Sequence, residues 1–272
     1  MTDEPRTAEI DIDGRRYAWR SIGAGPPLIL LNGYSATAPD WDPTLLGGLA
    51  SSFELLCPDH RGMGQSQLGE PSALSVDAMA ADVERLMDAV GFESGPIAGW
   101  SMGGFVAQRV AIRAPQRVDA LVLMGTDPGG AAAVRATPQA WAQLTDHSGT
   151  PREQASRLIP LLFPPAFAPA IDDAFGDLIA TARAELSLDA LEAQQRAMVK
   201  WHVDDQPAPA ADAALRTLVM AGREDIVIPP ENAALLAQRW PDAEVEMFDG
   251  AHAFFALEPQ RVADRIAAFL PA

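Results

Sequence analysis

The chain has 272 residues with 20 basic and 37 acidic side chains, so its formal net charge is −17, and 48% of its residues are apolar. Nucleic acids and anionic membrane surfaces attract clustered lysine and arginine, so this acidic balance argues against both as partners. The length suffices for one large core, with or without an inserted piece. The single cysteine, Cys57, rules out an internal disulfide.

The first residues, Met1 to Arg6, lack the apolar stretch of a secretory signal. No apolar run approaches the roughly 20 residues that are needed to cross a bilayer. We therefore expect a cytoplasmic protein without a membrane-spanning segment.

A hairpin opens the chain, because Ala8–Ile12 and Arg15–Ser21 flank the turn dipeptide Asp13-Gly14. Short apolar runs, typical of strands buried on both faces, then alternate with amphipathic helical patterns. The runs are Pro27–Leu31, Phe53–Cys57, Pro96–Trp100, Ala120–Met124, Thr217–Ala221 and Val245–Phe248. The helical patterns are Ser75–Val90, Gly103–Arg113, Pro230–Arg239 and Pro259–Leu270. This alternation predicts an α/β fold with a largely parallel sheet covered on both faces.

The alternation stops between about Asp127 and Asp212, where Pro151–Leu162 and Ser187–Lys200 are helical and no strand is evident. The simplest interpretation is a helical insertion that returns the chain to the same sheet. We expect a core domain over residues 1–126 and 213–272 and a helical cap over residues 127–212. The insertion is rich in large apolar residues, which favours a packed unit over a flexible linker.

The most informative segment is Gly99-Trp100-Ser101-Met102-Gly103-Gly104, which joins a predicted strand to a predicted helix. G-x-S-x-G in this setting is typical of a nucleophile held on a strained turn, with its oxygen above the sheet. The glycines two residues before and two after Ser101 avoid clashes with that turn. The free amides of the helix N-terminus favour negative charge beside Ser101.

With this motif the chain resembles the α/β-hydrolase family over essentially its whole length. The resemblance implies a mostly parallel eight-stranded sheet, helices on both faces and a helical cap. It also implies an oxyanion loop after an early strand, here Asn32-Gly33-Tyr34, with Asn where relatives carry His. The backbone amides of Tyr34 and Met102 are then the expected oxyanion donors. The family's Asp-x-Arg-Gly-x-Gly-x-Ser segment appears as Asp59 to Ser66, where His60 is expected to support loops rather than act as a base.

A serine nucleophile needs a base, and the base needs an orienting acid; in this family the chain order is Ser, then Asp or Glu, then His. Asp225 holds the acid position in the loop after Thr217–Ala221, with Glu224 as its neighbouring alternative. Asp127, just after the Leu121–Met124 strand, is a second candidate, since some relatives carry the acid there. His252, in Gly250-Ala251-His252, follows the last strand and is the predicted base.

The other groups of the chain indicate neither metal nor cofactor chemistry. No cluster has zinc-ligand spacing and no phosphate-binding glycine motif is complete, so we expect neither a metal nor a cofactor. His147 and His202 lie in the insertion without a partner motif and are interpreted as surface or packing residues. A position at the border of the pocket is the alternative for His202. No Arg or Lys stands in a catalytic motif, which disfavours strongly anionic substrates.

Two groups of large side chains are the predicted pocket walls. Trp100 and Phe254 are expected beside the catalytic positions, and the cap residues over the site are expected to include Trp141, Phe163, Met198 and Trp201. An apolar pocket favours a small to medium, moderately hydrophobic carboxylic ester or lactone. Two alternatives use the same triad, a cofactor-free haloperoxidase or perhydrolase and a carbon–carbon bond hydrolase. A non-catalytic ligand-binding protein of the same fold is the third.

Overall fold

The computed structural model describes residues 5–209 and 215–270. Its eight strands form one sheet in the order β1-β2-β4-β3-β5-β6-β7-β8. They are β1 (Arg6–Ile12), β2 (Arg15–Ile22), β3 (Pro27–Leu31), β4 (Glu54–Pro58), β5 (Gly95–Trp100), β6 (Val118–Met124), β7 (Arg216–Gly222) and β8 (Ala243–Phe248). β2 pairs antiparallel with β1 and β4, and every other pairing is parallel. The expected α/β fold with a mostly parallel sheet is therefore confirmed.

Both faces of the sheet are covered, since successive residues of a strand point to opposite sides. In β3, Ile29 and Leu31 join one core cluster, whereas Leu28 and Leu30 join the other. The first cluster takes in α2 (Val76–Ala89), α3 (Met102–Arg113) and α8 (Asn232–Arg239). The second takes in α1 (Pro43–Ala50), α9 (Phe254–Leu257) and α10 (Pro259–Phe269). This double covering explains why the strands read as continuous apolar runs.

The helices that the apolar pattern predicts appear within a few residues of their expected bounds. Ser75 caps α2 by accepting a hydrogen bond from the amide of Ala78. The pattern misses α1, whose Gly47 and Gly48 are poor helix formers. A Cβ on Gly48 would lie 2.6 Å from the Cβ of Ala263, so the close approach of α1 to α10 requires this glycine.

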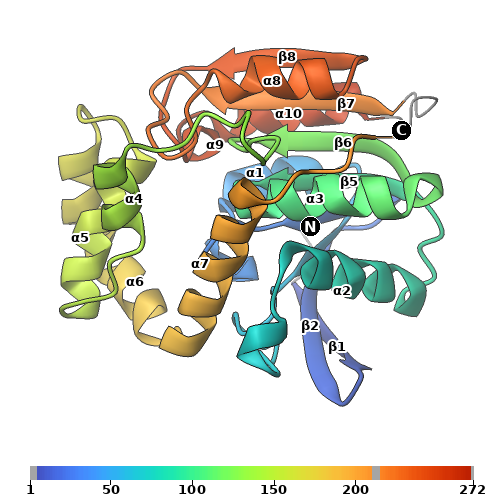
Figure 1. Ribbon diagram of the computed structural model, residues 1–272, viewed down its shortest axis with the longest axis horizontal. Helices are drawn as coiled ribbons and strands as arrows, with labels where there is room; N and C mark the ends of the chain where they lie inside the picture. The colour runs from blue at the N-terminus through green and yellow to red at the C-terminus, as the bar shows by residue number, and fades with distance from the viewer. Residues whose placement is uncertain (1–4, 210–214, 271–272) are drawn as a thin grey trace.

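Four helices lie between β6 and β7, namely α4 (Pro138–Leu144), α5 (Pro151–Leu162), α6 (Ala168–Ala184) and α7 (Leu188–Val203). Figure 1 shows them grouped at the end of the molecule toward which the arrowheads of the parallel strands point. The sequence pattern misses α4 and α6, because few of their side chains are buried and no clear apolar stripe results. The expected domain boundary between residues 212 and 213 lies outside the described residues. None of the described helices is both long enough and apolar enough to span a membrane.

Candidate active site

Ser101 lies on the turn between β5 and α3 with a φ of 55°. Few residues other than glycine adopt such a conformation, and in folded proteins it is concentrated at functional sites. Two hydrogen bonds hold the turn: the amide of Ser101 donates to the carbonyl of Met124, and the hydroxyl of Thr126 donates to the carbonyl of Ser101. The predicted nucleophile therefore sits on a fixed, strained turn at the N-terminus of α3.

The glycines around Ser101 are required by close backbone approach. A Cβ on Gly99 would collide with the backbone of Gly103, and one on Gly103 would collide with the carbonyl of Leu31 in β3. Both collisions involve backbone atoms, which cannot rotate away as a flexible side chain does. The sharp turn is therefore possible only with the residue types that the sequence carries.

His252 and Asp225 meet directly, from the loops that follow β8 and β7. Nδ1 of His252 lies 2.7 Å from Oδ2 of Asp225, and both side chains are almost fully buried. The other carboxylate oxygen, Oδ1, accepts hydrogen bonds from the amides of Val227 and Ile228 at 2.9 and 2.8 Å. The indole of Trp100 donates to the carbonyl of His252 at 3.0 Å. Because Asp225 occupies Nδ1, Nε2 is the ring nitrogen of His252 that is left for proton exchange.

The loop Asn32-Gly33-Tyr34 runs against Ser101. A Cβ on Gly33 would lie 3.0 Å from the Cβ of Ser101, so the loop that carries the predicted oxyanion donor, Tyr34, passes beside the predicted nucleophile. The side-chain amide of Asn32 donates to the backbone carbonyl of Thr37. Nε2 of His60 lies 3.1 Å from the backbone carbonyl oxygen of Asn32. Burial lowers the pKa of His60 to about 4. His60 is thus a neutral ring that anchors this loop, in agreement with its expected supporting role.

A cavity of about 330 Å³ opens at Ser101, and two of the four inserted helices, α4 and α7, contribute to its lining. Most of its walls are apolar, which suits an uncharged organic group. Two predicted wall residues, Trp141 and Met198, line it. The complete lining is Ser101, Phe105, Asp127, Val134, Arg135, Ala136, Pro138, Trp141, Leu144, Met198, Val199, His202, Val203, Val227 and Ile228.

The other four predicted wall residues lie elsewhere. Phe254 is fully buried and stacks on Phe248 in the core, and Phe163 packs against the same core cluster. Trp100 packs among Trp41, Phe255 and His252. Trp100 and Phe254 are buried in the core, where their large apolar surfaces are removed from water, and Phe163 is half-buried against it.

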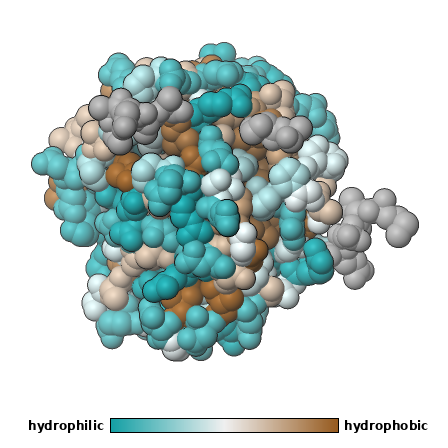
Figure 2. Space-filling view, turned by 90° about the vertical axis from the view of Figure 1, so that its right-hand side faces the viewer, coloured by the Kyte–Doolittle hydropathy of each residue, from teal (hydrophilic) through white to brown (hydrophobic). Residues whose placement is uncertain are grey.

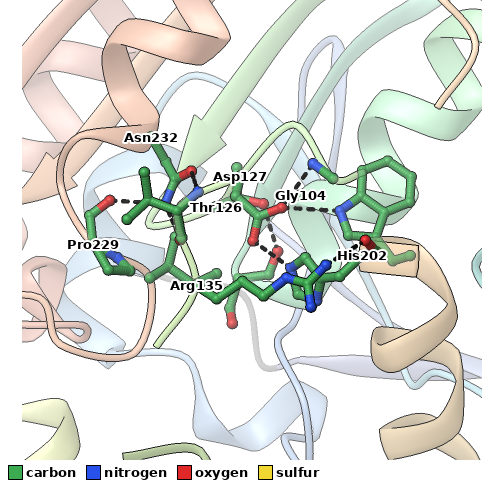
Figure 3. A network of polar contacts seen from close by, with 12 residues as sticks. Gly104, Thr126, Asp127, Arg135, His202, Pro229 and Asn232 are labelled. Atoms are coloured by element: carbon green, nitrogen blue, oxygen red, sulfur yellow. Dashed lines mark hydrogen bonds and ion pairs between the residues drawn. The ribbon is translucent and has the colours of Figure 1, made fainter. Parts of the chain in front are cut away.

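The fourth, Trp201, belongs to a polar cluster around Asp127. Its ring stacks on Phe105 and its Nε1 donates to Oδ1 of Asp127 at 3.1 Å. Nε2 of His202 lies 2.9 Å from Oδ2 of the same carboxylate (Figure 3). Asp127 therefore binds His202 and not His252, so the structure pairs Asp225, not this second candidate, with the predicted base.

No sequence motif assigns a role to two cavity residues, His202 and Arg135. His202 lines the cavity, which was the alternative to a surface or packing position, and has a fixed carboxylate partner. The sequence signal for His202 was its place in the insertion. Asp127 lies 75 residues away in the chain, and the residues around His202 do not indicate it as the partner. Arg135 lies in a segment without helix or strand, where no sequence motif announces a role.

The predicted family is shown by comparison with known proteins. A family model described as the alpha/beta hydrolase fold matches residues 26–259. The chain belongs to the α/β-hydrolase family. Pimeloyl-acyl-carrier-protein methyl ester esterase of Klebsiella pneumoniae is 31% identical over 267 residues, covering 89% of this chain and 92% of that protein. RutD of Azorhizobium caulinodans, provisionally named a carbamate hydrolase, is 28% identical over 243 residues, covering 87% of this chain and 88% of that protein.

Among solved structures, an alpha/beta hydrolase fold protein from Chitinophaga pinensis superimposes with a TM-score of 0.82. It is 25% identical, and the match covers 97% of both chains. These relatives support hydrolase activity for this member of the family.

A polar contact ties the inserted helices to the loop beside Ser101. The hydroxyl of Tyr34 lies 2.9 Å from Nε2 of His147, which follows α4. Burial raises the pKa of the Tyr34 hydroxyl well above its usual range and lowers that of His147. Both groups are therefore neutral at pH 7, and the contact is an ordinary hydrogen bond between the segment after α4 and the loop after β3.

Cavity size alone does not locate the site. A larger hollow of about 930 Å³ lies at the amino ends of β3 and β4, where its lining includes Pro27 and Glu54. That end of the molecule, seen in Figure 2, is mainly hydrophilic with scattered apolar patches. Ser101, His252 and Asp225 all follow the carboxyl ends of strands, so the hollow is remote from them. Within the described residues, no group of three or more His, Cys, Asp or Glu side chains is placed to hold a metal ion.

Proposed function

We propose that this α/β-hydrolase is a cytoplasmic serine hydrolase that cleaves small to medium, moderately hydrophobic carboxylic esters or lactones. The observation that carries the proposal is the combination of three features beyond the carboxyl ends of the strands. A strained serine opens into a cavity, a buried histidine is paired with an aspartate in the loops after β8 and β7, and the walls of the cavity are largely apolar. The ester named for the Klebsiella relative agrees with this substrate class.

In the proposed reaction the Oγ of Ser101 attacks the substrate carbonyl carbon while Nε2 of His252 takes its proton. The carbonyl oxygen becomes an oxyanion, which accepts hydrogen bonds from the amides of Tyr34 and Met102. Asp225 stabilises the resulting imidazolium through Nδ1. When the tetrahedral intermediate collapses, the bond to the leaving alcohol breaks and His252 protonates that alcohol.

The second half of the reaction repeats these roles with water. His252 takes a proton from a water molecule, whose oxygen attacks the acyl carbon of the ester on Ser101. Collapse of the second intermediate releases the carboxylic acid and returns the proton to Oγ of Ser101. Apart from the substrate and this water molecule, no group outside the chain is needed to balance either half.

The proposal is tested with Ser101→Ala, assayed on p-nitrophenyl esters of increasing chain length, on lactones and on a carbamate. Loss of a triad member costs about 10⁴–10⁶ in rate, so hydrolysis is expected to fall to the background. A fluorophosphonate probe is expected to label the wild type once, at Ser101, and to leave the variant unlabelled. Hydrolysis by the variant close to that of the wild type, or labelling at another residue, would overturn the assignment.

A further inference from the structure

The cavity at Ser101 has one polar end. Asp127, Arg135 and His202 lie among its lining residues, whereas the other side chains of the wall, apart from Ser101, are apolar. Polar groups that line a cavity of this kind fix the orientation of the ligand and select among ligands. The chemistry of this end therefore bears on which substrates fit.

His202 is held in one orientation. Both oxygens of Asp127 have partners: Oδ1 accepts from the amide of Gly129 at 2.8 Å and from Trp201, and Oδ2 binds Nε2 of His202. The edge of the imidazole also packs on Phe105. Because Asp127 occupies Nε2, Nδ1 is the nitrogen that the ring keeps for another partner. Burial leaves 2% of the Asp127 side chain exposed, so this anchor is shielded from water.

Arg135 brings a positive charge to the same end. Its Nη2 donates to the backbone carbonyl of His202 at 2.7 Å, and Figure 3 shows its side chain extending toward that residue. No carboxylate among residues 5–209 and 215–270 forms an ion pair with Arg135, whereas Arg152, Arg261 and Arg265 each pair with two. The carbonyl occupies only one of its five N–H donors.

We propose that Arg135 and His202 form a subsite for a carboxylate, so that the preferred substrates are esters bearing an acidic group at the end remote from the scissile bond. This inference rests on the proposed hydrolysis at Ser101 and specifies its substrate class. The substrate carboxylate accepts hydrogen bonds from the guanidinium and, when Nδ1 is protonated, from the imidazole. Asp127 balances the charge that the ring then carries. The apolar wall, with Trp141 and Met198, covers the chain between the carboxylate and the ester.

This subsite reverses the expectation that strongly anionic substrates are disfavoured. That expectation rested on the absence of Arg and Lys from the catalytic motifs. The fold brings Arg135 to the cavity from a segment that has no motif.

The test compares matched substrates that differ only in charge. Methyl esters of dicarboxylic acids place the carboxylate on the acyl side, and acetyl esters of hydroxy acids place it on the alcohol side. Each is paired with its terminal amide, which has nearly the same shape and no charge. Since hydrogen bonds to charged groups are the stronger ones, wild-type kcat/KM is expected to favour the acid by about 10- to 100-fold in at least one series, mainly through KM.

Three variants separate the subsite from general electrostatics. Arg135→Gln and His202→Gln are each expected to reduce the acid-to-amide ratio about tenfold or more. Arg196→Gln removes the same charge from an exposed position on α7 and is expected to keep the ratio of the wild type. Circular dichroism of each variant checks folding, and the exposed position of Arg135 makes its substitution the safer one.

The outcomes distinguish this inference from the proposed function. If the amide-terminated esters are hydrolysed as efficiently as the acids, the proposed carboxylate subsite is overturned and the proposed hydrolase function stands. A preference that survives Arg135→Gln, or a stronger preference for hydroxyl-terminated esters, also overturns it. If neither acids nor amides are hydrolysed and the fluorophosphonate does not label Ser101, the proposed function itself fails.

Discussion

Replacing Asp225 by Asn tests the proposed acid while changing very little of its shape. The wild-type carboxylate accepts two backbone hydrogen bonds at Oδ1, from Val227 and Ile228, and one contact from His252 at Oδ2. An asparagine must place its oxygen on one of these sides and its NH2 on the other. Facing the two amides with the oxygen keeps two hydrogen bonds, whereas the reverse keeps one and sets N–H groups against N–H groups. At about 1 kcal/mol for each hydrogen bond, the first orientation wins.

The consequence for catalysis follows from that orientation. The asparagine NH2 then donates to Nδ1 of His252, which forces the ring into the tautomer with its proton on Nε2. Nε2 can no longer take the proton of Ser101. A triad histidine held in the wrong tautomer loses about 10⁴ in kcat, which is about 5.5 kcal/mol of transition-state stabilisation. The fold is expected to survive, because the backbone hydrogen bonds persist.

The assay is kcat on a neutral p-nitrophenyl ester, with thermal unfolding of each protein as the check on folding. Asp127→Asn is the matched comparison, since it makes the same change in a buried aspartate that binds His202. Its expected loss is no more than about tenfold, because only the Asp225 carboxylate contacts the predicted base. A loss below tenfold in Asp225→Asn, or an equally large loss in Asp127→Asn, would refute the reasoning.

Two further expectations concern the surroundings of the site. Tyr34→Phe removes the hydrogen bond to His147 but keeps the backbone amide, so the free energy of unfolding is expected to fall by about 0.5–1.5 kcal/mol and kcat by less than tenfold. A hundredfold loss of kcat would instead implicate the hydroxyl in catalysis. The second concerns His60, whose pKa is about 4 in the folded protein and about 6.5 when unfolded. Between these values the unfolded chain binds the proton and the folded chain does not, so stability falls as the pH drops from 6.5 to 4, by about 3 kcal/mol. In His60→Gln, denaturant unfolding is expected to show a flatter dependence over this window; an unchanged slope would contradict the assigned cause.

The parts of the fold that sequence alone predicts are those where local pattern and burial agree. The six apolar runs after the hairpin correspond to β3–β8. In β3–β7 the reason is that a strand covered on both faces has no polar side to interrupt the run, whereas the edge strand β8 is partly exposed. The helices that the sequence pattern misses are those in which local pattern and burial do not agree. In α1 the glycine that reads as a helix breaker is kept for close packing on Ala263, which is a contact between residues far apart in the chain.

For the candidate site, sequence order and spacing are enough to choose Ser101, Asp225 and His252. Each follows the carboxyl end of a strand, and parallel strands bring these ends to one edge of the sheet. The structure adds that Asp225 and His252 are in contact at 2.7 Å and that Asp127 is engaged by His202. The pocket walls escape prediction, because whether a tryptophan or phenylalanine faces a cavity or the core depends on the packing of several elements at once.

The sequence by itself determined the family, the order of the strands along the chain and the strained glycine-flanked turn that carries Ser101. These features depend on local steric rules and on periodicity, which a chain expresses residue by residue. Only the tertiary structure decided that His202 and Asp127 form a pair and that Arg135 faces the same cavity as Ser101. Such contacts join residues on separate elements, and their partners are set by how the inserted helices pack on the sheet.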